Sequence, residues 1–113
     1  MPKKKSIDLK TMLPKKTKVH GMDYKVQLTA KVTHQDIPVM GICDYPNRTI
    51  KISKDFHTPE TIHSTFLHEL FHANCRTSSL EQVISPDLEE IIVDTMAKVV
   101  CENFILIPKD RID

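Results

Sequence analysis

Two histidines and a glutamate in the second half of the chain have the types and spacing of a metal site. His68 and His72 are four residues apart, and Glu69 directly follows the first histidine. If this segment is helical, residues i and i+4 lie on the same face about one turn apart, so both imidazoles can bind one metal ion. Glu69 can then lie beside a water on that ion without being a ligand. The pattern predicts a zinc-dependent hydrolytic site, although an amphipathic helix with two solvated histidines has the same spacing.

This predicted zinc site needs a third protein ligand, because a catalytic zinc ion usually has three of them and a water. Glu90 and Asp94 form a second i, i+4 pair further along the chain. Glu90 is the predicted third ligand, and Asp94 is predicted to accept the free ring N–H of a ligand histidine and so to fix its tautomer. Glu89 is a rival ligand, because a shift of one residue rotates a helix by about 100°. Stabilisation of a helix N-terminus also explains Glu89 and Glu90, but it explains Asp94 poorly.

Two helices are predicted to carry these side chains. The first begins after a cap at Thr58, with Pro59 at its first position, and it ends at the polar stretch 76–79. The second begins after a cap at Ser85 and ends near Pro108, because proline cannot continue a helix. The apolar residues that recur at helical spacing are Ile62, Phe66, Leu70 and Ala73 in the first helix, and Leu88, Ile91, Ile92, Met96, Val99, Val100 and Phe104 in the second.

The chain before the helices shows the alternation of apolar and polar residues that is typical of β-strands. A break at residues 20–23 predicts one hairpin. Residues 46–48, between the runs 39–45 and 49–53, predict a second. A small N-terminal sheet rich in antiparallel pairs, followed by two long helices, places the chain in the α+β class.

The two motifs together resemble the gluzincin group of zinc metallopeptidases. The resemblance rests on the HExxH sequence at 68–72 and the ExxxD sequence at 90–94, with seventeen residues between them. The context of the first motif, 65–73, and the preceding strand, 49–53, resemble the small zincin-like domains of the ImmA/IrrE type found in phage and mobile-element proteins. The similarity covers residues 39–104 and implies a minimal zincin-like domain.

The resemblance also implies a role for each of the five side chains that carry it. His68, His72 and Glu90 would be zinc ligands, and Glu69 would be the general base. Asp94 would accept a hydrogen bond from the ring N–H of a ligand histidine. The implied reaction is hydrolysis of a peptide or protein substrate, with Zn²⁺ as the cofactor. Larger gluzincins stabilise the oxyanion with a histidine or tyrosine, for which this chain has no motif-level counterpart. The candidates are Tyr45, His57, His63 and Arg76, each of which ordinary packing also explains.

A non-catalytic role for the same zinc site is the competing hypothesis. A small domain gains stability from a metal that ties two helices together, so the ligands could serve folding and an interaction surface alone. Glu69 discriminates between the two, because hydrolysis needs this carboxylate and a structural site does not. A fourth protein ligand, for example Cys75, would favour the structural role. For the enzyme, strand 49–53 could pair with an extended substrate if it is the sheet edge that faces the cleft.

Charge is unevenly distributed along the chain, although 16 basic and 15 acidic residues leave a net charge of only +1. Residues 1–20 contain seven lysines and one aspartate, a formal charge of +6, which leaves −5 for the remainder. We expect a basic N-terminal arm at 1–18, a single zincin-like domain at 19–108 and a C-terminal tail at 109–113. Without interleaved aromatic residues, the arm predicts at most weak, nonspecific contact with nucleic acid.

Composition argues against several other classes of protein. No apolar run approaches the roughly twenty residues of a membrane-spanning helix, and the N-terminus lacks the apolar stretch of a secretory signal. With only two glycines, Gly21 and Gly41, the chain has no Gly-rich phosphate loop. Three cysteines without CxxC spacing indicate reduced thiols rather than disulfides. We therefore expect a cytoplasmic protein with no membrane partner, while its oligomeric state stays open.

Overall fold

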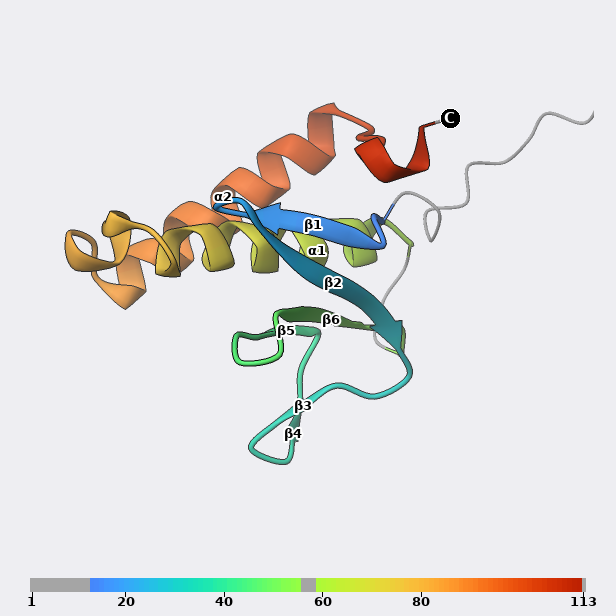
Figure 1. Cartoon of the computed structure of the whole chain (residues 1–113), viewed down its shortest axis with the longest axis horizontal. Coiled ribbons are helices and arrows are strands. Elements are labelled where there is room, and N and C mark those ends of the chain that lie inside the picture. Colours follow the sequence, from blue (N-terminus) through green and yellow to red (C-terminus); the bar gives the residue numbers. More distant parts are fainter. Residues whose placement is uncertain (1–12, 56–58, 113) are drawn as a thin grey trace, which may run out of the picture.

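A four-stranded sheet packed against two long helices makes up most of the fold (Figure 1). The computed structural model describes residues 13–55 and 59–112. These residues confirm the α+β class. The strands of the sheet are β1 (Lys16–Val19), β2 (Met22–Thr29), β5 (Gly41–Asp44) and β6 (Thr49–Ser53), and the helices are α1 (Pro59–Arg76) and α2 (Pro86–Asn103). The smaller elements are the paired strands β3 (Thr33–His34) and β4 (Ile37–Pro38) and two 3₁₀ helices, Ser79–Gln82 and Lys109–Arg111.

The strand order in the sheet is β1-β2-β6-β5, with a parallel pair at its centre. β1 and β2 form the first predicted hairpin, and its turn residues His20 and Gly21 have φ values of 49° and 81°. Positive φ at both positions is what a two-residue type I′ turn requires. β5 and β6 form the second predicted hairpin. Both hairpins are thus confirmed, and the pairing of β2 with β6 makes the sheet mixed.

The strand at one edge of the sheet is β5, not the strand 49–53 considered for substrate pairing. Strand 49–53, which is β6, lies between β2 and β5 and pairs with both, so it cannot accept a substrate strand. Ile50 and Ile52 on it are fully buried. The condition for substrate pairing at this strand is therefore not met, and a local pattern cannot tell a central strand from an edge one. The free edge of this hairpin among the described residues is β5.

Both helices begin where their sequence signals place them. Ser85 caps α2, because its hydroxyl oxygen accepts a hydrogen bond from the Leu88 N–H at 3.1 Å. α1 begins at Pro59, and its predicted cap, Thr58, lies outside the described residues. α2 ends at Asn103, well before Pro108. Neither of the two long helices is apolar enough to cross a lipid bilayer.

The main core lies between the sheet and α1, and α2 packs on the other side of α1 (Figure 1). Glu89, Val93 and Ala97 are the buried residues of α2. The apolar stripe that predicted this helix is mostly exposed. Its exposed members are Leu88, Ile91, Ile92, Met96, Val99 and, just beyond the helix, Phe104. Apolar spacing therefore identified the helix but not the face that it buries.

Among the described residues, the folded domain extends beyond both ends of the predicted range 19–108. Leu13 is buried in the core, and β1 begins at Lys16. The carboxylate of Asp110 accepts hydrogen bonds from the backbone N–H groups of Lys15 and Lys16, at 2.8 and 3.2 Å. Arg111 donates to the Leu13 carbonyl at 2.9 Å. Residues on both sides of the expected boundaries thus join the fold, while residues 1–12 lie outside the described part.

Candidate metal centre

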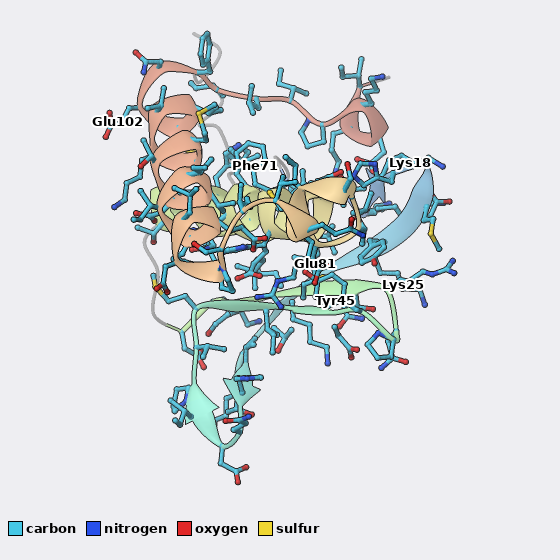
Figure 2. The ribbon with its side chains drawn as sticks, turned by 90° about the vertical axis from the view of Figure 1, so that its left-hand side faces the viewer. Lys18, Lys25, Tyr45, Phe71, Glu81 and Glu102 are labelled. Atoms are coloured by element: carbon cyan, nitrogen blue, oxygen red, sulfur yellow. The ribbon has the colours of Figure 1, made fainter. Side chains whose placement is uncertain are left out.

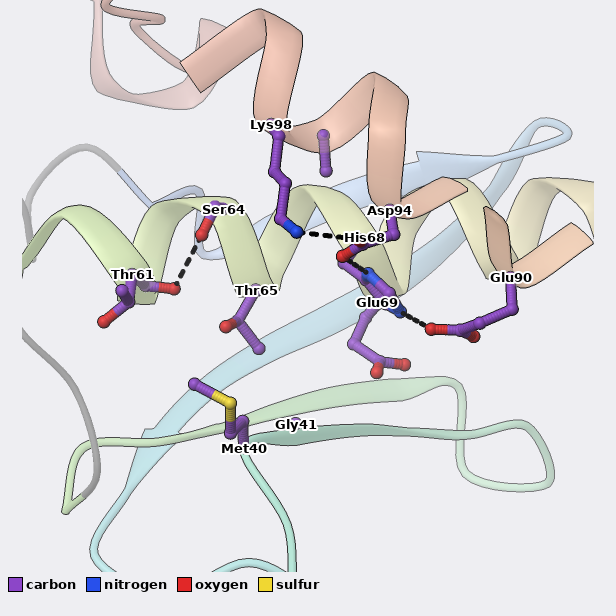
Figure 3. Close-up of a pocket in the computed structure, with 11 residues that line it drawn as sticks. Met40, Gly41, Thr61, Ser64, Thr65, His68, Glu69, Glu90, Asp94 and Lys98 are labelled. Atoms are coloured by element: carbon purple, nitrogen blue, oxygen red, sulfur yellow. Dashed lines mark hydrogen bonds and ion pairs between the residues drawn. The ribbon is translucent and has the colours of Figure 1, made fainter. Parts of the chain in front are cut away.

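The three predicted ligands come together where α1 faces the N-terminal half of α2. Figure 3 shows two of them, His68 and Glu90. His68 Nε2 lies 3.1 Å from Glu90 Oε1, and His72 Nε2 lies 2.8 Å from Glu90 Oε2. The two Nε2 atoms are 3.1 Å apart. Ligands on a tetrahedral zinc ion are about 3.3 Å apart, given bond lengths near 2.0–2.1 Å. The three groups therefore need to separate by only a few tenths of an ångström to hold the ion.

The remaining ring nitrogens of both histidines face carboxylates. His72 Nδ1 donates to Glu89 Oε2 at 2.6 Å, and His68 Nδ1 lies 3.6 Å from Asp94 Oδ1. Glu90 faces both Nε2 atoms as well, so carboxylates lie on both sides of each ring. If a cation were bound on the Nε2 side, each proton would lie on Nδ1, where Glu89 or Asp94 can accept it, and both Nε2 lone pairs would be free for the ion. The donor set of two imidazoles and one carboxylate, with a second carboxylate near each Nδ1 atom, fits a zinc ion.

Glu89, the rival candidate for the third ligand, does not lie among the possible ligand atoms. Its side chain is 6% exposed and contacts His72, whereas the Glu90 side chain is 58% exposed. The Arg76 Nε atom also lies 3.6 Å from Glu89 Oε2. Sequence reasoning missed this arrangement, but a signal was present. Glu89, Val93 and Ala97 follow one another at i, i+4 and i+8 on the buried stripe of α2, where a carboxylate needs a partner.

Glu69 lies next to the ligands and points toward β5 (Figure 3). It lines a cavity of about 420 Å³ together with His68, Glu90, Asp94 and Gly41 of β5. Burial raises the pKa of the Glu69 carboxyl, while the neighbouring imidazoles and Arg76 act in the opposite direction. A carboxylate with a raised pKa is a better proton acceptor at neutral pH than an exposed one. Glu69 is therefore placed to take a proton inside the cavity, and it is outside the group of possible ligands.

Gly41 allows β5 to pass close to α1 beside Glu69. A Cβ atom at this position would lie 2.8 Å from Thr65 Cγ2 and 3.3 Å from Glu69 Cγ. Any side chain here would push β5 away from the helix, so the glycine sets the distance between the Glu69 carboxylate and the edge strand. The sequence signal was an isolated glycine inside a strand, which often marks a close approach of the backbone.

The described candidates for an oxyanion-stabilising group do not line the cavity beside Glu69. Tyr45 is half-buried beside Cys43, and burial raises the pKa of its phenol. His63 is buried among the residues of a different groove, and Arg76 contacts Glu89. His57 lies outside the described residues. Cys75, which could have closed the site as a fourth ligand, is outside the group of possible ligands.

We expect the substitution Glu89→Gln to weaken zinc binding by about 10–100-fold, the usual cost of losing a partner behind a ligand histidine. An amide is a weaker acceptor for the His72 N–H than a carboxylate, and it carries no charge to raise the basicity of the ring. Competition with a chromophoric chelator would measure the affinity. The matched control is Glu102→Gln near the C-terminal end of the same helix, where the side chain is exposed (Figure 2). Equal affinities for the two variants would contradict the positioning role of Glu89.

Comparison with known proteins found no matching family model, curated protein or solved structure. The gluzincin resemblance therefore stays a prediction, and the geometry of the site is what supports a functional assignment.

Proposed function

We propose that this protein is a zinc-dependent metallopeptidase of minimal zincin-like architecture. One observation carries the proposal: His68, His72 and Glu90 place one ligand atom each within 4.8 Å of the others, while the Glu69 carboxylate beside them lines a cavity. A metal site needs only the first three groups. A hydrolytic site needs the fourth as well. The arrangement of a sheet, an HExxH helix and a second ligand-bearing helix supports the zincin-like assignment.

Each group has a defined task in this proposal. When bound, zinc lowers the pKa of a coordinated water toward about 7 and polarises the carbonyl of the scissile bond. Glu69 accepts the proton from the attacking water and delivers it to the leaving amine. Glu89 would accept the Nδ1 proton of His72 at 2.6 Å, and Asp94 would do the same for His68 once the 3.6 Å between them shortens. The free edge of β5 is the place where an extended peptide or protein substrate would add as a further strand.

A purely structural zinc site has less support. Structural zinc normally has four protein ligands, and the described residues bring three together. Burying a carboxylate such as Glu69 opposes folding unless a partner or a function compensates for it. Its position in the cavity is therefore better explained by catalysis than by stability.

The cellular location that we propose is the cytoplasm. Cys43, Cys75 and Cys101 are all free thiols in the described structure. Free thiols are typical of proteins in reducing compartments, where disulfides are rare.

The proposed function predicts one zinc per chain and metal-dependent hydrolysis. The full chain would be saturated with zinc, desalted, analysed for metal and incubated with a library of internally quenched peptides. We expect about one equivalent of zinc, cleavage of a subset of peptides, loss of cleavage with a chelator and recovery when zinc is restored. Zinc below about 0.2 equivalents would contradict the metal site. One equivalent without cleavage of any peptide would favour the structural alternative.

A further inference from the structure

A second groove, of about 610 Å³, lies between β1, α1 and the segment that follows α2. None of the zinc-site residues lines it. Its apolar surface comes from Phe66, Leu67 and Leu70 of α1 and from Leu106 and Ile107 of the C-terminal segment. The groove is therefore independent of the proposed peptidase site, and any ligand it takes needs its own explanation.

His63 is the unusual residue among those that line this groove. The residue is 9% exposed, and both of its ring nitrogens are buried without a hydrogen-bond partner among residues 13–55 and 59–112. Burial lowers the pKa of the imidazole, so at neutral pH the ring is uncharged and offers one N–H donor and one acceptor. Buried polar groups in folded proteins are nearly always paired, so an unpaired imidazole among the residues that line a groove indicates a missing partner, which the ring would reach by a small rotation toward the groove.

Three lysines line the same groove, and they make it cationic. Lys16, Lys18 and Lys109 are exposed, and Asp110 is the acidic residue that lines the groove within the described part of the chain. The Asp110 carboxylate is already engaged by two backbone N–H groups of the residues at the start of β1. The Lys18 ammonium pairs with Asp23 at 2.7 Å, which leaves Lys16 and Lys109 as the more available charges.

The imidazole and the available charges lie toward the same end of the groove. His20, directly after β1, contacts the carbonyl oxygen of Asn74 near the C-terminal end of α1 at 3.0 Å. β1 and α1 run in the same direction (Figure 1). Measured from the His20–Asn74 contact toward the N-terminal ends of the two elements, Lys16 lies roughly 13 Å away along the strand. His63 lies roughly 16 Å away along the helix. His63 and Lys16 thus lie toward the same end of the groove. Asp110, next to Lys109, contacts the backbone of Lys16 there. Leu70 lies toward the other end.

We propose that this groove binds an unbranched fatty carboxylate of medium chain length. The carboxylate accepts the His63 N–H and faces Lys16 and Lys109, while the alkyl chain covers Leu67 and Leu70. Apolar walls with a few convergent polar groups are the usual composition of a small-molecule site. The N-terminal segment 1–12 is a poorer occupant, because its four lysines and one aspartate would bring like charge to a cationic groove.

Calorimetry with the full chain tests the proposal, with decanoate as the probe and decanol as its uncharged analogue. We expect saturable one-to-one binding of decanoate with a Kd between about 10 and 500 µM and at least about tenfold weaker binding of decanol. Lys16→Glu and Lys109→Glu should each weaken decanoate binding by about fivefold or more. The matched control is Lys31→Glu, an exposed lysine outside the groove, which should change the Kd by less than about twofold.

A second measurement uses the wild-type chain and so does not depend on how the variants fold. The ring ¹⁵N resonances of His63 should move on addition of decanoate, while those of His68 and His72 should not. The proposal is overturned by no saturable binding up to about 1 mM, by equal affinity for decanol, or by an unmoved His63. Co-sedimentation with phosphatidylglycerol vesicles in the absence of decanoate binding would also overturn it in favour of a lipid surface. None of these outcomes depends on zinc or on hydrolysis.

Discussion

Replacing Glu69 with glutamine should lower kcat by about 10²–10⁴-fold while leaving one zinc ion bound per chain. Glutamine has nearly the same size and shape as glutamate, so it fits the space between α1 and β5 that Gly41 leaves open. Its amide cannot accept a proton from the attacking water. Because Glu69 is outside the ligand group, the affinity for zinc should stay within a fewfold of the wild-type value. Single-turnover kinetics on a peptide cleaved by the wild type, together with metal analysis, would measure both quantities.

The matched control for this variant is Glu81→Gln, an exposed glutamate in the 3₁₀ helix that links α1 to α2. It should retain full turnover. Unchanged turnover in Glu69→Gln would exclude Glu69 as the base. Loss of zinc together with turnover would instead show that Glu69 supports the ligands, and this result would remove the main argument for catalysis over a structural site.

Local sequence signals were sufficient for the elements that carry the site. The cap at Ser85 and the positive φ at His20 and Gly21 are properties of a few adjacent residues, so the start of α2 and the β1–β2 hairpin could be predicted without knowledge of the fold. The spacing of His68 and His72 likewise fixes their common face once the segment is helical. These features involve contacts within one or two turns of chain.

Features that depend on distant contacts could not be predicted in the same way. β6 is central because it pairs in parallel with β2, whose paired residues lie more than twenty positions earlier in the sequence. The buried face of α2 is set by packing on α1, which turns Glu89 inward and leaves the Leu88 and Ile92 side chains exposed. One residue corresponds to about 100° of helix rotation, so the packing of α2 decides which glutamate contacts both Nε2 atoms and which contacts His72 Nδ1.

Replacing His72 with alanine should abolish zinc binding and also destabilise the chain without zinc by about 1–3 kcal/mol. His72 is both a ligand and the closest partner of Glu89, whose side chain is 6% exposed. The substitution leaves that carboxylate with Arg76 at 3.6 Å as its remaining ion-pair partner. Zinc at about 100 times its Kd should stabilise the wild type by about 2.7 kcal/mol and the variant by almost nothing. Urea unfolding with and without zinc would measure all four free energies.

A double variant separates the two roles of His72. In His72→Ala/Glu89→Leu the unpaired carboxylate is gone, so the stability of the zinc-free chain should recover in part, whereas zinc binding should not recover at all. The control His34→Ala, at an exposed position on β3, should leave both quantities unchanged. If zinc stabilises His72→Ala as much as the wild type, the ion binds elsewhere on the chain. The cluster of His68, His72 and Glu90 would then be a hydrogen-bonded contact between two helices, and the proposed peptidase would have no metal at its centre.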